Sequence, residues 1–181
     1  MLARVYLAMS DYSNAAQYAK YCLSQRDVLI DYNALNTNSA YPFSWNNEEV
    51  IFSVYIANPS TLLQNGHAID STLYRSYVDD DLRKVLYFRI NAGLPRFKGG
   101  YFGSASCFVG LATDEIYLIA MECLIRLGQL KEAEILFNRL LITRYKIEKY
   151  NLIDFSKEEE ALAPVLKERR KSLLFRCLRF S

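Results

Sequence analysis

Histidine and tryptophan are nearly absent from this 181-residue sequence, which has one of each. A Ser-His-Asp or Cys-His centre would have to use His67, which stands between Gly66 and Ala68 in a polar stretch. A lone histidine in a loop is usually a surface residue, so the sequence argues against nucleophilic catalysis. One histidine with no cysteine beside it also leaves zinc without a ligand set.

Metal-like cysteine spacing and long apolar runs are absent too. No Cys-x-x-Cys occurs, and three of the four cysteines fall in predicted helices, so free, buried thiols are favoured over a disulfide framework. The most apolar stretch, 107–125, is interrupted by Asp114 and Glu115 and is no membrane span. Residues 1–9 lack the apolar run and cleavage site of a signal peptide.

The charges are balanced, with 22 basic and 20 acidic residues, which gives no reason to expect a nucleic-acid partner. The one basic cluster, 167–171, fits the solvated face of a helix. Asp79, Asp80 and Asp81 are the best calcium candidate but lack the pattern of an EF-hand. Capping of a helix start and pairing with Arg83 is the preferred interpretation, so no metal or cofactor is expected.

Two helical hairpins dominate what is present, one at 1–25 and one at 113–142. In the first, Leu2, Val5, Tyr6 and Met9 form an apolar stripe. Ser10 and Asp11 break it, and either can cap the next helix. In the second, Thr113 can act as N-cap and Gly128 supplies the left-handed stop. Both turns are followed by an inward alanine, the mark of a tetratricopeptide-type hairpin. The stripes predict these inward residues: Tyr12, Ala15, Ala16, Ala19, Cys22 and Leu23, then Ile116, Ile119, Ala120, Cys123, Leu124, Leu127, Leu130, Ala133, Phe137, Leu140 and Leu141.

Residues 26–112 form a loop-rich insertion between the hairpins. The run 50–56 is β-branched and aromatic and predicts a strand, and 85–90 predicts another that turns through 91–95 into a small β-hairpin. Gly99 to Gly103 is expected to be a mobile loop leading back to the helices. The fold class is therefore mainly α, a single helical domain over 1–181 with a small β-hairpin in its insertion.

The last segment is predicted to be a helix that starts at a capping box of Ser156 and Glu159 and is kinked or restarted at Pro164. Its apolar face is predicted at Leu162, Leu166, Leu173 and Leu174.

Aromatic rings are unusually abundant, with 14 tyrosines and 10 phenylalanines. Tyr41, Phe43 and Trp45 alternate with small residues, which in an extended segment places all three rings on one side. Rings beside the amide of Asn46 suit a sugar, although rings more often anchor a loop onto its scaffold. The predicted ligand contacts are Tyr41, Trp45, Asn46 and Tyr101.

Five segments, in this order, resemble the SusD/RagB family of glycan-capture lipoproteins. They are 2–15, with Leu-Ala-Arg-Val-Tyr-Leu-Ala-Met and the following Asp11, Tyr12 and Ala15; 47–52; 80–88; 110–119; and 168–175. The family pattern is not matched at Ser172, Arg176, Cys177 and Phe180, and members extend further at both ends. The resemblance therefore implies an interior portion or a truncated paralogue.

The resemblance implies a tetratricopeptide-like scaffold at the surface of the outer membrane, held there by a lipid anchor that this chain does not carry. It also implies a binding protein, not an enzyme, that passes oligosaccharides to a TonB-dependent transporter. The alternative is a helical-repeat adaptor that binds another protein in a groove, or a paralogue without a ligand. Aromatic rings and amides gathered in a surface concavity would favour the first function, and an exposed apolar groove with the loop rings buried would favour the adaptor.

Overall fold

The computed structural model describes residues 1–57 and 68–178, apart from the side chain of Glu159. His67 lies outside the described residues. The described elements, in chain order, are α1 (Leu2–Ala8), α2 (Tyr12–Gln25), a 3₁₀ turn (Tyr32–Ala34), β1 (Val50–Phe52), β2 (Tyr55–Ile56), α3 (Ser71–Arg75), α4 (Arg83–Leu86), β3 (Phe88–Asn91), β4 (Leu94–Phe97), β5 (Cys107–Phe108), β6 (Leu111–Ala112), α5 (Thr113–Arg126), α6 (Leu130–Ile142) and α7 (Glu158–Ser172). The prediction of a mainly α fold is confirmed.

Both helical hairpins form where the sequence predicts them. Between α1 and α2, the carboxylate of Asp11 caps α2 by accepting the backbone N–H of Asn14 at 3.1 Å. Between α5 and α6, Gly128 has φ +73°, a conformation that a residue with a Cβ rarely adopts. The N-cap prediction for Thr113 is wrong, because Ala112 caps α5 and the Thr113 hydroxyl instead donates to the carbonyl of Glu49.

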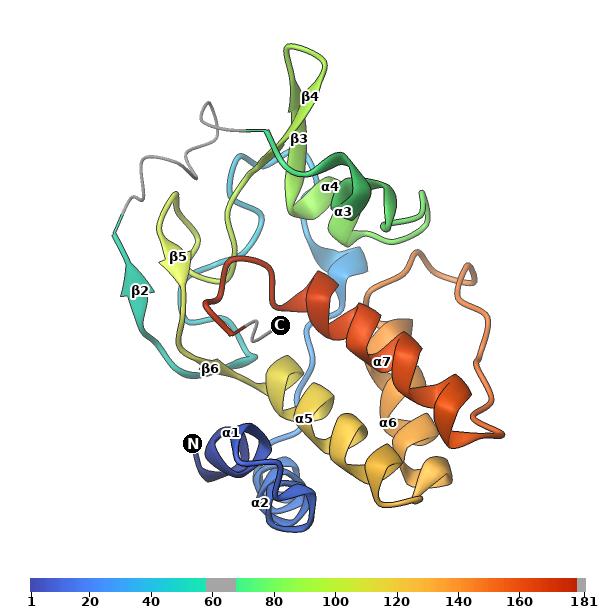
Figure 1. The fold of residues 1–181 in the computed structure, drawn as a ribbon. Coiled ribbons are helices and arrows are strands. Elements are labelled where there is room, and N and C mark those ends of the chain that lie inside the picture. The colour runs from blue at the N-terminus through green and yellow to red at the C-terminus, as the bar shows by residue number, and fades with distance from the viewer. Residues whose placement is uncertain (58–67, 179–181) are drawn as a thin grey trace.

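Helix α5 is the centre of the helical layer. Every residue from Thr113 to Ile125 is buried, whereas the sequence predicted one buried stripe. The reason is that α1 and α2 pack on one side of α5 while α6 and α7 pack on the other (Figure 1). Leu127, predicted to point inward, lies past the end of α5 and is exposed. The first predicted stripe fails as well, since Leu2, Val5 and Met9 are exposed.

Small residues let these helices approach closely. Ala15 and Ala19 of α2, Ala120 of α5 and Ala133 of α6 are all 0% exposed, as their place in the hairpin pattern predicts. Ala133 packs in a core with Phe137 and residues of α5 and α7.

Replacing Ala133 with Leu should lower the free energy of unfolding by about 1–3 kcal/mol, because the interior has no room for three more carbons. Ala163→Leu, at an exposed position of α7, is the matched control and should change little. Urea unfolding followed by circular dichroism measures both, and equal stability of the two variants would contradict the packing of α6 described above.

The run 50–56 forms two short strands and not the single strand predicted. Strand β1 pairs antiparallel with β6, and β2 pairs antiparallel with β5. The register slips between Val50 and Phe52, within β1, and residues 53 and 54 lie between the two strands. These pairs bring the start of the run beside the entry to α5 and leave most of its side chains exposed.

The predicted β-hairpin exists as β3 and β4 and projects from one end of the molecule (Figure 1). Its first half was placed too early, because Arg83–Leu86 is the helix α4. The predicted pairing of the aspartates 79–81 with Arg83 is confirmed for Asp81. Its carboxylate accepts hydrogen bonds from both the backbone N–H and the guanidinium of Arg83.

The predictions of a capping box at the start of α7, of a restart at Pro164 and of a buried Leu166 are wrong. The helix begins after Lys157, without a side-chain cap at Ser156, and the Glu159 side chain is outside the described residues. It runs through Pro164 as one helix. Leu166 is exposed, whereas Leu173 is buried.

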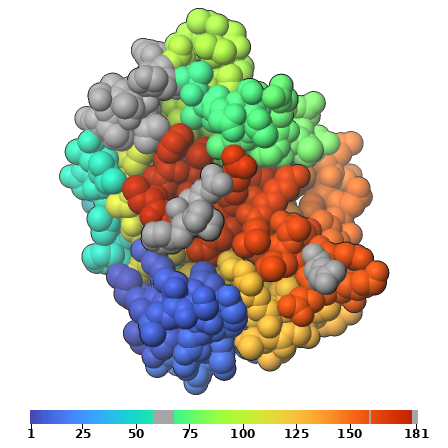
Figure 2. All heavy atoms as spheres, viewed as in Figure 1, coloured from blue at the N-terminus to red at the C-terminus, as the bar shows by residue number. Residues whose placement is uncertain are grey.

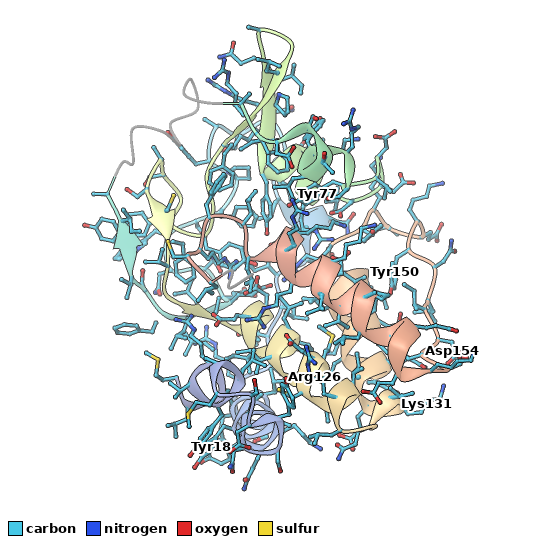
Figure 3. The ribbon with its side chains drawn as sticks, viewed as in Figure 1. Tyr18, Tyr77, Arg126, Lys131, Tyr150 and Asp154 are labelled. Atoms are coloured by element: carbon cyan, nitrogen blue, oxygen red, sulfur yellow. The ribbon has the colours of Figure 1, made fainter. Side chains whose placement is uncertain are left out.

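The basic cluster at 167–171 is not a uniformly solvated face, because Glu168 and Lys171 are buried. Figure 3 places Tyr77 near the C-terminal end of α7, where its hydroxyl donates to the carbonyl of Lys171. The cluster thus joins α7 to the segment that carries α3 and α4.

The four cysteines are free, and Cys107 and Cys123 are buried as predicted. Cys177 lies past the end of α7 and is exposed. Among the described residues, no helix is long and apolar enough to cross a membrane.

Candidate ligand-binding surface

Three aromatic rings meet at the surface and form the aromatic platform, defined here as Trp45, Tyr55 and Phe102. Tyr55 stacks on Phe102 with ring centroids 4.2 Å apart, and Trp45 and Phe102 form a T-shaped pair with ring centroids 6.5 Å apart. Trp45 is 66% exposed and Tyr55 is 52% exposed. Figure 2 shows the teal segment around β2 on the outer edge of the molecule, open to solvent. The platform therefore offers flat apolar faces to a ligand.

Close backbone packing fixes the two loops that carry Trp45 and Phe102. Gly103 has φ +69°, and a Cβ there would lie 2.7 Å from the carbonyl oxygen of Phe43. The Asn47 side chain joins the same loops, since its amide donates to the carbonyls of Ser44 and Tyr101. Only a glycine allows this approach, so the Gly99–Gly103 loop, predicted to be mobile, is packed against the segment 43–47.

Tyr101 anchors the platform from below. Its hydroxyl donates to Glu49 Oε2 at 2.6 Å and lies 2.7 Å from the hydroxyl of Tyr32. Its ring lies under the guanidinium of Arg176, whose Cζ is 4.1 Å from the ring centroid. Because Tyr101 points inward, its neighbour Phe102 points outward and joins the platform.

Two buried ion pairs surround Tyr101. Arg144 Nη2 lies 2.6 Å from Glu49 Oε1, and the Arg176 guanidinium binds both carboxylate oxygens of Asp114 at 2.8 and 2.9 Å. Fork-to-fork pairing of this kind is strong and directional. The pairs join four distant parts of the chain, namely the residue before β1, the start of α5, the turn after α6 and the segment after α7.

Burial has the largest effect on the pKa values of Tyr101 and Glu49. It raises the pKa of Tyr101 well above its usual value, and nearby Asp114 and Glu49 raise it further. It also raises the pKa of Glu49, although the charge of Arg144 opposes that effect. Tyr101 therefore stays a hydrogen-bond donor at neutral pH. Because Glu49 and Asp114 are ion-paired and closed to solvent, they hold the scaffold and are not placed for acid–base chemistry.

Of the four predicted contact residues, Tyr41, Trp45 and Asn46 are exposed and Tyr101 is buried. Trp45 lies in the platform, and Asn46 follows it on the surface in a left-handed conformation with φ +57°. Tyr41 is exposed beside Gly99, whose Cβ would lie 3.2 Å from the Tyr41 ring. Tyr101 is 1% exposed, so we correct its place from ligand contact to support of the platform.

The three alternating rings do not share one side, since Phe43 is buried between Tyr32 and Tyr101. Anchoring of the loop, the other interpretation of the pattern, therefore applies to Phe43. Tyr55 and Phe102 were not predicted as contacts. Their signal is weak in sequence: Tyr55 sits in a strand-like run, and nothing local tells which of Tyr101 and Phe102 points outward.

A second buried ionic cluster lies between α4 and α7. Arg83 Nη2 is 2.7 Å from both Asp81 Oδ2 and Glu168 Oε2, and Lys171 Nζ is 2.5 Å from the same Asp81 oxygen. Each carboxylate is ion-paired with cationic side chains of the protein, so this cluster serves packing. Among residues 1–57 and 68–178, no group of histidine, cysteine and carboxylate side chains is arranged to hold a metal ion.

No protein-family model and no curated protein matches this sequence. Solved structures do match it. A SusD-like carbohydrate binding protein from Bacteroides vulgatus superposes with a TM-score of 0.67 at 21% identity, covering 97% of this chain and 41% of that one. The chain has the SusD-like fold. A SusD superfamily protein from the same species gives a TM-score of 0.70 at 19% identity, over 97% of this chain and 45% of that one.

A SusD-like protein from Bacteroides fragilis matches 96% of this chain and 50% of its own length, with a TM-score of 0.67 and 14% identity. This chain thus spans at most half the length of these three SusD-like structures. At such identities the likeness carries the fold and not the ligand, so the function of this chain is argued from its own surface.

Proposed function

We propose that this chain is the oligosaccharide-binding part of a non-enzymatic glycan-capture protein. The observation that carries the proposal is the aromatic platform, in which Trp45 and Tyr55 stay exposed although each is in ring contact with Phe102. Ring faces bind the C–H faces of sugars, and the exposed amide of Asn46 can bind hydroxyls. The SusD-like fold supports the proposal, because one structure of that fold is described as carbohydrate binding.

We extend the proposal to the cellular setting that the SusD/RagB resemblance implies. The protein would work at the surface of the outer membrane in nutrient uptake, held by a lipid anchor, and pass oligosaccharides to a TonB-dependent transporter. The competing function, a helical-repeat adaptor, required the loop rings to be buried. Phe43 fits that requirement, whereas Tyr41 and Trp45, the other two loop rings, do not.

Titration with a panel of neutral oligosaccharides should shift the NMR signals of Trp45 and its neighbours. A short ring surface gives modest affinity, so we expect a Kd no better than about 1 mM, or about 4 kcal/mol. Trp45→Ala and Tyr55→Ala should each weaken binding about fivefold, or by about 1 kcal/mol. Tyr21→Ala, at an equally exposed ring on α2, is the control and should leave the affinity unchanged.

Shifts that cluster on another surface and are unaffected by Trp45→Ala would reject this site. Absence of shifts across the whole panel would favour a scaffold without a ligand.

Incubation with the same glycans should give no hydrolysis or transfer, since the two carboxylates around Tyr101, Glu49 and Asp114, are buried in ion pairs. Chromatography of the reaction mixture checks this. Turnover that is lost when one carboxylate is replaced would overturn the binding-only function.

A further inference from the structure

A concave site lies at the C-terminal end of α6, away from the aromatic platform. It has a volume of about 380 Å³ and is formed by the segment Asp31 to Asn33, the C-terminal end of α6 and the following loop as far as Leu152. Figure 3 shows Tyr150 in this loop, between α6 and α7. The volume falls within the range of small-ligand pockets, of about 300–1,000 Å³.

Internal hydrogen bonds hold the wall of this cavity in place. Asn33 accepts the backbone N–H of Ile147 at 3.2 Å and donates to the carbonyl of Tyr145 at 3.0 Å. The Tyr150 hydroxyl donates to Asn138 at 2.7 Å, and its ring packs on Tyr145 with centroids 5.3 Å apart. The cavity is therefore preformed, which reduces the entropy lost when a ligand binds.

The charge of the lining is negative on balance. Asp31 and Glu148 contribute two carboxylates, whereas the one lining cation, Lys146, has a carboxylate oxygen of Asp80 3.1 Å from its Nζ. Asp31 Oδ1 accepts both hydrogen bonds from Asn33. Among the described residues no donor binds Asp31 Oδ2, so this oxygen is open to a ligand.

The C-terminal end of α6 adds to the negative electrostatic potential of the cavity. The cavity lies at the C-terminus of α6, the negative end of the helix dipole. Arg139, the cation in the last turn of α6, is engaged by Asp27 at 2.7 Å.

Apolar side chains line the rest of the cavity. Ile147 and Leu152 are each 71% exposed and Ile142 is 53% exposed, which is unusual for three aliphatic residues so close together. The half-buried ring of Tyr150 lies among them. A ring face beside aliphatic groups suits an apolar body, and the ring also attracts a cation.

We propose that this cavity binds a small cationic ligand, in which a single ammonium or guanidinium group is attached to an apolar body. The cation would lie against the carboxylates of Asp31 and Glu148, and the apolar body would lie against Ile142, Ile147 and Tyr150. The site is separate from the aromatic platform, and the proposal does not depend on glycan binding.

The test is an NMR titration of the whole chain with 2-phenylethylamine, with 2-phenylethanol as its neutral counterpart and 3-phenylpropionate as its anionic counterpart. We expect the amine to shift the backbone signals of Asn33, Ile147 and Leu152 and to bind about fivefold more tightly than the alcohol, with the carboxylate weakest. Added 0.5 M NaCl should remove most of the difference between amine and alcohol.

Variants separate charge from shape. Glu148→Gln should weaken amine binding about fivefold and leave alcohol binding unchanged. Glu132→Gln, an exposed carboxylate in the first turn of α6 and thus at the other end of the helix, is the matched control and should change neither. Equal affinity for amine and alcohol, an unchanged amine affinity in Glu148→Gln, or shifts confined to another surface would each overturn the proposal.

Discussion

Arg144→Met should lower the free energy of unfolding by about 3–5 kcal/mol, the cost of leaving a buried charge without its partner. Arg144 and Glu49 are both 0% exposed, and the guanidinium also donates to the carbonyl of Ile30 at 2.8 Å. Methionine fills much of the same space, so the change removes the charge more than the packing. Urea unfolding at neutral pH measures the loss.

The loss should depend on pH in a defined direction. Burial raises the pKa of Glu49 above its usual value, so folding favours its protonated form. The stability this gives is fully present below the unfolded pKa, near 4.5, and is lost as pH rises through the folded pKa. Since the charge of Arg144 opposes the increase, its removal raises the folded pKa further. The deficit of Arg144→Met should therefore be smaller at pH 5 than at pH 8.

Two variants control this experiment. Arg139→Met removes an exposed arginine from α6, the helix that ends just before Arg144. Its pair with Asp27 is half exposed, so the change should cost about 1 kcal/mol or less. The double variant Glu49→Gln with Arg144→Met should be more stable than Arg144→Met alone, because it removes the uncompensated charge. A deficit that is the same at both pH values and is not relieved by Glu49→Gln would mean that the buried charge is not the cause.

The helical hairpins could be predicted because their signals are local. Asp11 and Gly128 mark turns by their own chemistry, and the alanines mark close approach whatever lies opposite. The uniform burial of α5 was not predictable from its period, since it depends on α2 and α7 arriving from opposite ends of the sequence. The register slip in the run 50–56 has the same origin, because the partner strands lie about fifty residues away.

Part of the candidate site was predictable for a similar reason. Trp45 and Asn46 stand together in a turn-rich segment, so their exposure follows from the local sequence. Tyr101 and Phe102 are adjacent aromatic residues in a glycine-rich loop, and their opposite directions are set by Glu49 and Gly103. Glu49 and Gly103 lie beside these two rings only in the folded chain. The sequence therefore predicted Tyr101 as the ligand contact, whereas Phe102 is the ring in the platform.

Lys171→Met should cost about 3 kcal/mol, whereas Lys167→Met should stay within about 0.5 kcal/mol of the wild type. The two lysines lie one turn apart on α7 and look alike in the sequence, yet Lys171 is 2% exposed and Lys167 is exposed. Lys171 Nζ also lies 3.1 Å from Glu168 Oε1. Without it, Asp81 and Glu168 would share the single guanidinium of Arg83 in a closed site.

The same substitution at both positions makes the comparison direct. Methionine keeps most of the apolar stem of lysine, so the difference between the variants reports the buried ammonium and not lost packing. Thermal and urea unfolding of the pair, measured side by side, decide the matter. If both variants were as stable as the wild type, the basic cluster would be a solvated helix face after all. A loss confined to Lys171→Met would show that α7 is held to Asp81, before α4, by buried charge.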